Sequence, residues 1–317
     1  MVITQERDAL SCVVVFMRAP LVPITIAFLV GVWCGTVAPC PPMCLAALGA
    51  AGAGIAVRRW RPFDSAQGAV PSEVEGRRDG VLLRRYRDGE ARYPGTLEDY
   101  AFLSYGLLEL YEAGFEPRDL AEAKALAAQM VERFWDDTHG GFFLRSREEP
   151  ALIVRAKDVR DSATPSGNSL AALVLLRLGR LTGEERLEAL GRRTLDASAA
   201  AATQEPFGYP QLLIAWDFAL GPTKEIVIAG DPTAPQTAAL TRAVHERFLP
   251  RAVTLLHSPG ASGAVLEAVA PFVKTQEPLQ GQPTAYVCEH FVCRLPVTTV
   301  EELNRLLDDT QGPVHES

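Results

Sequence analysis

Residues Ser166–Ala202 read SGNSLAALVLLRLGRLTGEERLEALGRRTLDASAAAA and predict two helices joined by a short turn. The first helix, through Leu181, carries a Leu-Leu-x-Leu run, and the second, from Glu184, is rich in Leu and Ala at helical spacing. Thr182-Gly183 between them is a turn signal. The stretch therefore predicts a helical hairpin.

The same pattern occurs once earlier in the chain. Thr96–Ala113 (TLEDYAFLSYGLLELYEA) opens with a Thr-x-x-Asp capping box and has apolar residues at helical spacing, and Asp119–Trp135 supplies the second helix. Pro210–Leu220 adds one more helix. Recurring helix pairs cannot bury their apolar faces alone, so they stack into solenoids or close into α/α toroids. We predict such a mainly α-helical unit over residues 81–222.

The hydrophobic period changes after Gly221-Pro222. Two β-branched segments flank a helix, which predicts a small βαβ unit, and a third strand and a final helix follow. The predicted elements are strands at Lys224–Ala229, Ala252–Leu256 and Thr284–Cys288, a helix at Thr237–Phe248 and a last helix through Leu307. We expect an α/β module over residues 223–309 and a tail over 310–317.

The N-terminal part of the chain has a different character. After a leader at residues 1–18, residues 19–57 carry no charge and predict a transmembrane hairpin, with a signal peptide as the alternative. Arginines on both sides place both ends in the cytoplasm. Residues 58–80, rich in Pro, Gly, Ser, Glu and Arg, predict a disordered linker.

Composition excludes some classes of function. The chain has 317 residues, 48% of them apolar, which is typical of a core-forming protein. A net charge of -8 argues against a nucleic-acid partner, because phosphate binding needs a concentrated basic face. The six cysteines form two clusters without any Cys-x-x-Cys, so a secreted disulfide scaffold is not indicated.

Five stretches carry a family likeness. They are LEDYAFL (Leu97–Leu103), FWDDTHGGFF (Phe134–Phe143), DSATPSGNSLAAL (Asp161–Leu173), KEIVIAGDP (Lys224–Pro232) and AYVCEHFVCRLPVT (Ala285–Thr298). In this order they resemble the C-terminal part of the thioredoxin-domain-containing, spermatogenesis-associated protein family. Members of that family resemble an N-terminal thioredoxin-like domain followed by a six-hairpin, glycosidase-like α/α toroid, and this chain matches only the later portion. Since the chain predicts fewer than half of the helices of such a toroid, the ring is expected to be open unless an oligomer completes it.

A glycosidase-like site would need two carboxylates flanking the scissile bond. The candidates are Asp161, Glu98 and Asp99, with the alternatives that the last two offset the helix-start dipole and that the loop-to-helix entry around Asp161, with Thr164 as its cap, serves capping and packing alone. Possible substrate contacts are Asn168, Tyr209, Trp216 and His139, with packing and capping as their alternative. His139 is the single histidine in residues 81–222, so the histidine pair of sugar epimerases cannot be assembled there.

Cys288 and Cys293 flank His290 near the C-terminus. Three ligands fall short of a structural zinc site, so no metal is expected, and reduced cysteines are favoured over a disulfide. The turn after the KEIVIA strand lacks G-x-G-x-x-G, and no cofactor is expected.

The sequence thus supports three hypotheses of function. The favoured one is a truncated, non-catalytic member of the family, anchored to the membrane with its C-terminal domains in the cytoplasm, or cytoplasmic without that anchor. The second is a carbohydrate-active enzyme using the paired carboxylates. The third is a thiol-disulfide protein acting through Cys288 and Cys293.

Overall fold

A computed structural model describes residues 77–308 except 79, 88–89 and 150–153. The predicted leader, transmembrane hairpin and tail, residues 1–18, 19–57 and 310–317, lie outside the described residues, as does most of the predicted linker. Within the described ranges, no helix combines the length and apolarity needed to cross a bilayer.

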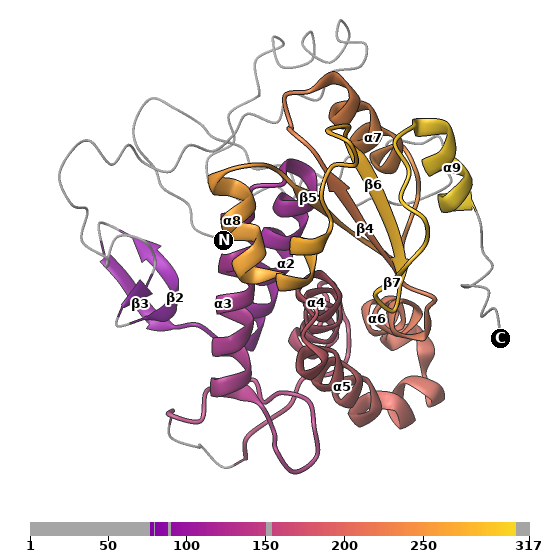
Figure 1. Cartoon of the computed structure of the whole chain (residues 1–317). Helices are drawn as coiled ribbons and strands as arrows, with labels where there is room; N and C mark the ends of the chain where they lie inside the picture. The colour runs from indigo at the N-terminus through magenta and orange to yellow at the C-terminus, as the bar shows by residue number, and fades with distance from the viewer. Residues whose placement is uncertain (1–76, 79, 88–89, 150–153, 309–317) are drawn as a thin grey trace, which may run out of the picture.

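The described fold is mainly helical with a small mixed four-stranded sheet (Figure 1). Its helical layer consists of α2 (Leu97–Gly114), α3 (Pro117–Phe134), α4 (Gly167–Thr182), α5 (Glu185–Gln204) and α6 (Pro210–Leu220), with a short 3₁₀ turn at Pro206–Gly208. Both predicted helix pairs are confirmed, with ends within a few residues of the expected ones. The helical spacing of their apolar residues therefore located these elements correctly.

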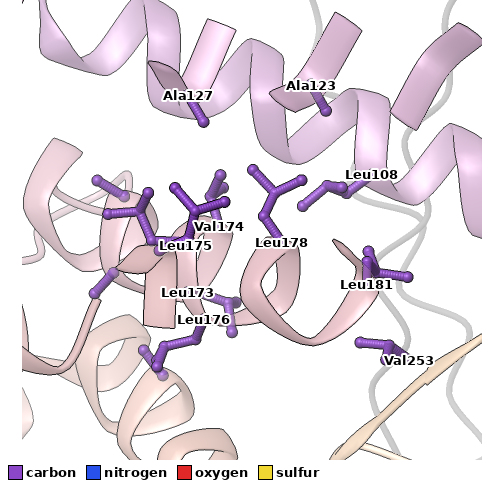
Figure 2. Close-up of a cluster of buried hydrophobic side chains, with 14 of the residues drawn as sticks. Leu108, Ala123, Ala127, Leu173, Val174, Leu175, Leu176, Leu178, Leu181 and Val253 are labelled. Atoms are coloured by element: carbon purple, nitrogen blue, oxygen red, sulfur yellow. The ribbon is translucent and has the colours of Figure 1, made fainter. Parts of the chain in front are cut away.

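Helix α4 lies at the centre of this layer. Every residue of α4 is buried, and the helix contacts α2, α5 and α6. Figure 2 shows Leu178 facing Leu108 of α2 and the helix α3 that carries Ala123 and Ala127, whereas Leu176 points to the opposite side of α4. A helix that is apolar nearly all round belongs inside a core rather than at its edge. Helix α5 can approach α4 closely because residue 191 of α5 is a glycine. A Cβ at Gly191 would lie only 2.8 Å from Leu176 Cγ of α4.

The sheet lies against the helical layer. Its strands are β4 (Lys224–Ala229), β5 (Ala252–His257), β6 (Thr284–Glu289) and β7 (Val292–Cys293), in the order β5-β4-β6-β7. Strands β4 and β5 are parallel and joined through α7 (Pro235–His245), which confirms the βαβ unit, and β6 is antiparallel to β4. The accompanying helices are α8 (Ala261–Val269), a 3₁₀ turn at Pro271–Thr275, and α9 (Val300–Asp308).

Both faces of the sheet are covered. Ile226 and Ile228 pack with residues of α7 and α9, while Val227 and Val253 belong to the same core cluster as α4. Successive side chains of a strand point to opposite faces, so a fully covered sheet requires the continuous apolar run seen in β4. One face of the sheet therefore shares a core with the helical layer, and the other face forms a second cluster with α7 and α9.

Two ion-pair groups centred on buried arginines lie among these elements. Arg177 of α4 binds Glu109 and Glu112 of α2, at 2.5 and 2.8 Å. Arg180, one turn on, lies 3.1 Å from Glu225 of β4, whose side chain is completely buried. The sequence alone did not single out either arginine, because each sits in an otherwise apolar helix whose neighbours only the tertiary fold supplies.

A second, three-stranded antiparallel sheet was not predicted. It comprises β1 (Arg77–Arg78), β2 (Val81–Arg87) and β3 (Glu90–Pro94). The predicted linker therefore ends before Arg77. The sheet is tied to α2, since the Leu82 amide donates to Tyr100 Oη at 3.0 Å. Its charge-rich strands carry little apolar alternation, the signal on which strand prediction depends.

Candidate functional site

Three of the sequence stretches singled out above meet at one end of the helical layer. The Leu97 amide at the start of α2 donates to the Leu144 carbonyl at 3.1 Å, just beyond the turn that follows α3. The first residue of α4, Gly167, packs so closely on Leu97 that a Cβ would lie 2.9 Å from its Cγ. Segments distant in sequence therefore form one surface at the starts of α2 and α4.

Asn168 ties this surface together from the inside. Its Oδ1 accepts the Phe142 amide at 2.7 Å, and its Nδ2 donates to the carbonyls of Phe142 and Asp158 at 2.9 and 2.7 Å. The side chain is buried and both amide protons are used. In this structure Asn168 clamps the turn after α3 onto α4, and nothing of its amide donor capacity is left for a ligand.

Asp161 caps two helices at once. Its Oδ1 accepts the Ser166 amide at 2.8 Å, before α4, and its Oδ2 accepts the amides of Gln211 at 2.8 Å and Leu212 at 3.4 Å, in the first turn of α6. The residue is 7% exposed. A carboxylate in this position satisfies backbone donors that a helix leaves free at its start and offsets the helix dipole.

The two other acidic candidates differ from each other. Asp99 Oδ2 accepts the amide and hydroxyl of Thr96 at 2.7 and 3.0 Å, which is the predicted capping interaction. Glu98 is half-buried, and burial, reinforced by the charges of Asp158 and Asp99, raises the pKa of its carboxyl, while Arg84 opposes the shift. The structure therefore gives Glu98 an electrostatic partner, Asp158, that the sequence did not indicate because it lies in no recognisable motif.

The predicted aromatic contacts are largely engaged in packing. Tyr209 is 6% exposed, and Trp216 is partly buried against the main core cluster. His139, by contrast, has a side chain that is 79% exposed, with its Nδ1 3.5 Å from Asp136 Oδ2. None of these three residues, nor Asn168, lines the hollow at the turn after α3.

A shallow hollow lies beside His139, in the turn after α3. It measures about 340 Å³ and is lined by Trp135, Asp136, Asp137, Thr138, Phe143, Arg147 and Arg155. Asp136 accepts the amides of Thr138 and His139 and binds Lys157 Nζ at 2.6 Å. The hydrogen bond from Lys157 holds the pKa of this carboxyl well below its usual range. The ionised carboxylate of Asp136 therefore holds the turn in place through these hydrogen bonds.

Replacing Lys157 by methionine should lower the free energy of unfolding by about 1–3 kcal/mol at pH 7, because a charge-assisted hydrogen bond is lost. A carboxyl whose pKa is lower in the folded protein than in the unfolded chain, where it is near 3.8, stabilises the fold at pH values above 3.8. This stabilisation is lost as the pH falls through the pKa of the folded protein. The difference between variant and parent, measured by urea unfolding, should therefore shrink below about pH 4. A gap that stays constant with pH, or an equal loss in a Lys274→Met control at an exposed lysine, would contradict this role.

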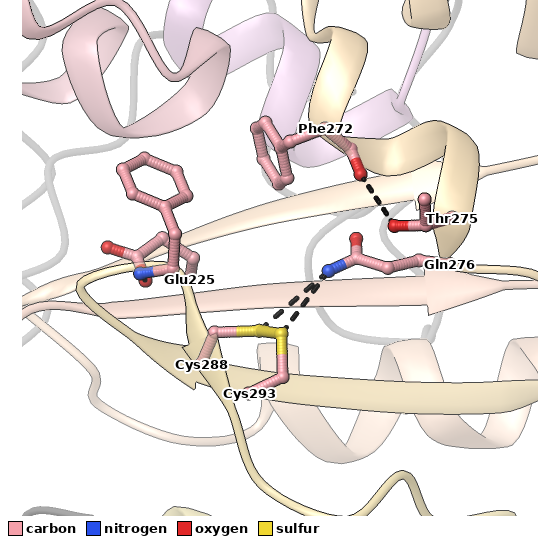
Figure 3. The surroundings of a disulfide bond; sticks show 7 residues. Glu225, Phe272, Thr275, Gln276, Cys288 and Cys293 are labelled. Atoms are coloured by element: carbon pink, nitrogen blue, oxygen red, sulfur yellow. Dashed lines mark hydrogen bonds between the residues drawn. A yellow bond between two sulfur atoms is a disulfide. The ribbon is translucent and has the colours of Figure 1, made fainter.

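The cysteine prediction needs correction. Cys288 and Cys293 form a disulfide, instead of the reduced pair that the sequence favoured (Figure 3). They lie opposite each other in β6 and β7 because a two-residue turn, His290-Phe291, brings the strands back together. That turn directs His290 Nδ1 toward Arg180, 3.2 Å away. In the described part of the chain no group of three or more His, Cys, Asp or Glu side chains could hold a metal ion.

Comparison with known proteins finds relatives for most of the chain. Over 214 residues, 67% of this chain, it is 39% identical to spermatogenesis-associated protein 20 of Homo sapiens, and 36% identical to the proteins of that name in Rattus norvegicus and Mus musculus. The chain spans 27% of the length of these relatives. No family model matches. Two thirds of this chain is therefore homologous to about a quarter of spermatogenesis-associated protein 20.

Proposed function

We propose that the helical region is a non-catalytic module of the thioredoxin-domain-containing, spermatogenesis-associated family, derived from a six-hairpin α/α toroid. The homology to spermatogenesis-associated protein 20 and the five ordered stretches of family likeness support the kinship. The two helix pairs of α2 with α3 and α4 with α5 are consistent with hairpins of such a toroid. The module would act through its folded surface.

The observation that carries the proposal is the use of Asp161. A general acid or base must reach the proton that it transfers in the substrate. Both oxygens of Asp161 are instead occupied by backbone amides of the segments that open α4 and α6. Asp99 is similarly held by Thr96. Two of the three predicted catalytic carboxylates therefore serve the fold.

The carbohydrate-active alternative would have to rest on Glu98. Its raised pKa suits a general acid, and Asp158 would be the second carboxylate. The thiol-disulfide alternative concerns Cys288 and Cys293 in the sheet, so it does not depend on whether the helical region is non-catalytic or carbohydrate-active.

A glycosidase assay of the full chain separates these possibilities. With a panel of aryl α- and β-glycosides and glucuronides, we expect no release of the aryl group above the rate without protein, and no change in Glu98→Gln or Asp158→Asn. Turnover that falls about 100-fold or more in Glu98→Gln, but not in Glu90→Gln at an exposed position, would overturn the proposal in favour of an enzyme.

A further inference from the structure

The β6–β7 hairpin places two sulfurs in unlike surroundings (Figure 3). Cys288 is 1% exposed and belongs to the main core cluster, on the side of the sheet that faces the helices. Cys293 lies in the two-residue edge strand β7 and is exposed. In thiol-disulfide exchange a thiolate attacks the sulfur that it can reach. Of the two cysteines, Cys293 is therefore the one on the side from which an external thiol can approach the bond.

Gln276 lies over the bond. Its Nε2 is 3.4 Å from Cys293 Sγ and 3.8 Å from Cys288 Sγ, and its Oε1 is buried with no hydrogen-bond partner among the described residues. In Figure 3 the amide nitrogen faces the sulfurs. A disulfide offers no donor, whereas a thiol does. Half a turn of the amide would let Oε1 accept the S–H of a released Cys288, a hydrogen bond that the closed state cannot form.

The hairpin tip is held independently of the disulfide. His290 and Phe291 have φ of 53° and 61°, the left-handed values that a two-residue hairpin turn of this type requires. The Phe291 amide donates to Glu225 Oε2 at 3.0 Å, and its ring packs edge-on against Phe272. These contacts keep β7 beside β6 when the sulfurs separate, so the bond can form again.

From these features we propose that Cys288–Cys293 is a reversible exchange site for low-molecular-weight monothiols, independent of the role proposed for the helices. A thiolate attacks Cys293 Sγ and forms a mixed disulfide there; the bond to Cys288 breaks, and its electron pair leaves with Cys288, which takes a proton from solvent. A second thiolate attacks the monothiol sulfur of the mixed disulfide, releasing the monothiol's own disulfide and leaving both cysteines reduced. The same small disulfide reverses the sequence.

The first test uses glutathione as the probe on the full chain. After incubation in mixed reduced and oxidised glutathione, acid quenching and alkylation, trypsin releases Thr275–Arg294 with both cysteines, and fragmentation locates the adduct. We expect glutathione on Cys293 and an alkylated thiol on Cys288. Cys288→Ser should accumulate the adduct on Cys293, whereas Cys293→Ser should leave Cys288 unmodified until the protein is unfolded in urea. An adduct on Cys288 in the native protein, or none on either residue, would overturn the proposal.

The second test isolates the amide. Gln276→Met keeps the side-chain volume but removes donor and acceptor, and we expect the equilibrium constant for opening the disulfide to fall about tenfold. Gln236→Met, a matched change at an exposed glutamine of α7 whose amide donates to the Thr298 carbonyl and not to a sulfur, should leave the constant unchanged. Circular dichroism checks that both variants are folded. Equal constants for Gln276→Met and the parent would overturn the role of Gln276.

Discussion

Asp161→Ala is expected to lower the free energy of unfolding by about 3–5 kcal/mol, because three backbone amides lose a buried, charged acceptor. Two of these amides belong to the first turn of α6, and the third precedes α4, the most buried helix of the fold. The loss should appear as a lower urea midpoint by circular dichroism, with little change in slope.

Asp137→Ala is the matched control for this substitution. Asp137 is an exposed aspartate in the same end of the helical layer, so its removal should change stability by no more than about 0.5 kcal/mol. If Asp161→Ala cost as little as Asp137→Ala, the capping role would be wrong. The side chain of Asp161 would then be free for the catalytic role that the sequence suggested.

Arg180→Met is expected to cost about 3–5 kcal/mol, because it leaves the carboxylate of Glu225 buried without its cation. Glu188, which also lies beside Arg180, is itself an acidic residue and cannot replace that charge. Urea unfolding at pH 7 measures the loss. Adding Glu225→Gln should recover a large part of it, since a neutral amide is far cheaper to bury than an unpaired charge.

The pH dependence provides the sign test for this pair. Burial raises the pKa of Glu225, although the Phe291 amide and Arg180 oppose the shift. When the pKa of a carboxyl is higher in the folded protein than in the unfolded chain, the protein loses stability as the pH rises through the range between the two pKa values. It regains that stability when the pH is lowered again. Removing Arg180 should raise the folded value further. The deficit of Arg180→Met should therefore shrink as the pH is lowered from 7 toward 5; a deficit that grew on acidification would contradict it.

Much of the fold could be predicted from local patterns. The helices of the two pairs and the βαβ unit follow from the spacing of apolar residues, which can be recognised within each segment by itself. The β1–β3 sheet and α8 escaped prediction, because their residues show neither clean alternation nor a distinct cap signal. The pairing of a charge-rich strand such as β2 depends on contacts with other elements of the fold, which the residues of the strand alone do not indicate.

The site was predicted only in part. Asp161, Asn168 and Asp99 were correctly recognised as polar residues at helix starts, but the same pattern fits a capping group and a catalytic group. The two roles differ in which groups the carboxylate or amide oxygens face. For Asp161 one of these groups is the amide of Gln211, which is distant in the sequence and brought close only by the fold. Asp158 and Arg180 were missed because each acquires meaning only from the partner that the fold brings to it.

The sequence by itself determined the order of helices and strands, since the spacing of apolar residues along a segment needs no partner to be recognised. It also indicated the similarity to spermatogenesis-associated protein 20 that comparison finds over 67% of the chain. Only the tertiary structure decided that Asp161 caps two helices, that Glu225 is buried against Arg180, and that Cys288 meets Cys293 across a turn. Hydrogen bonds, ion pairs and disulfides form between atoms a few ångströms apart, and that proximity is set by the packing of the whole core.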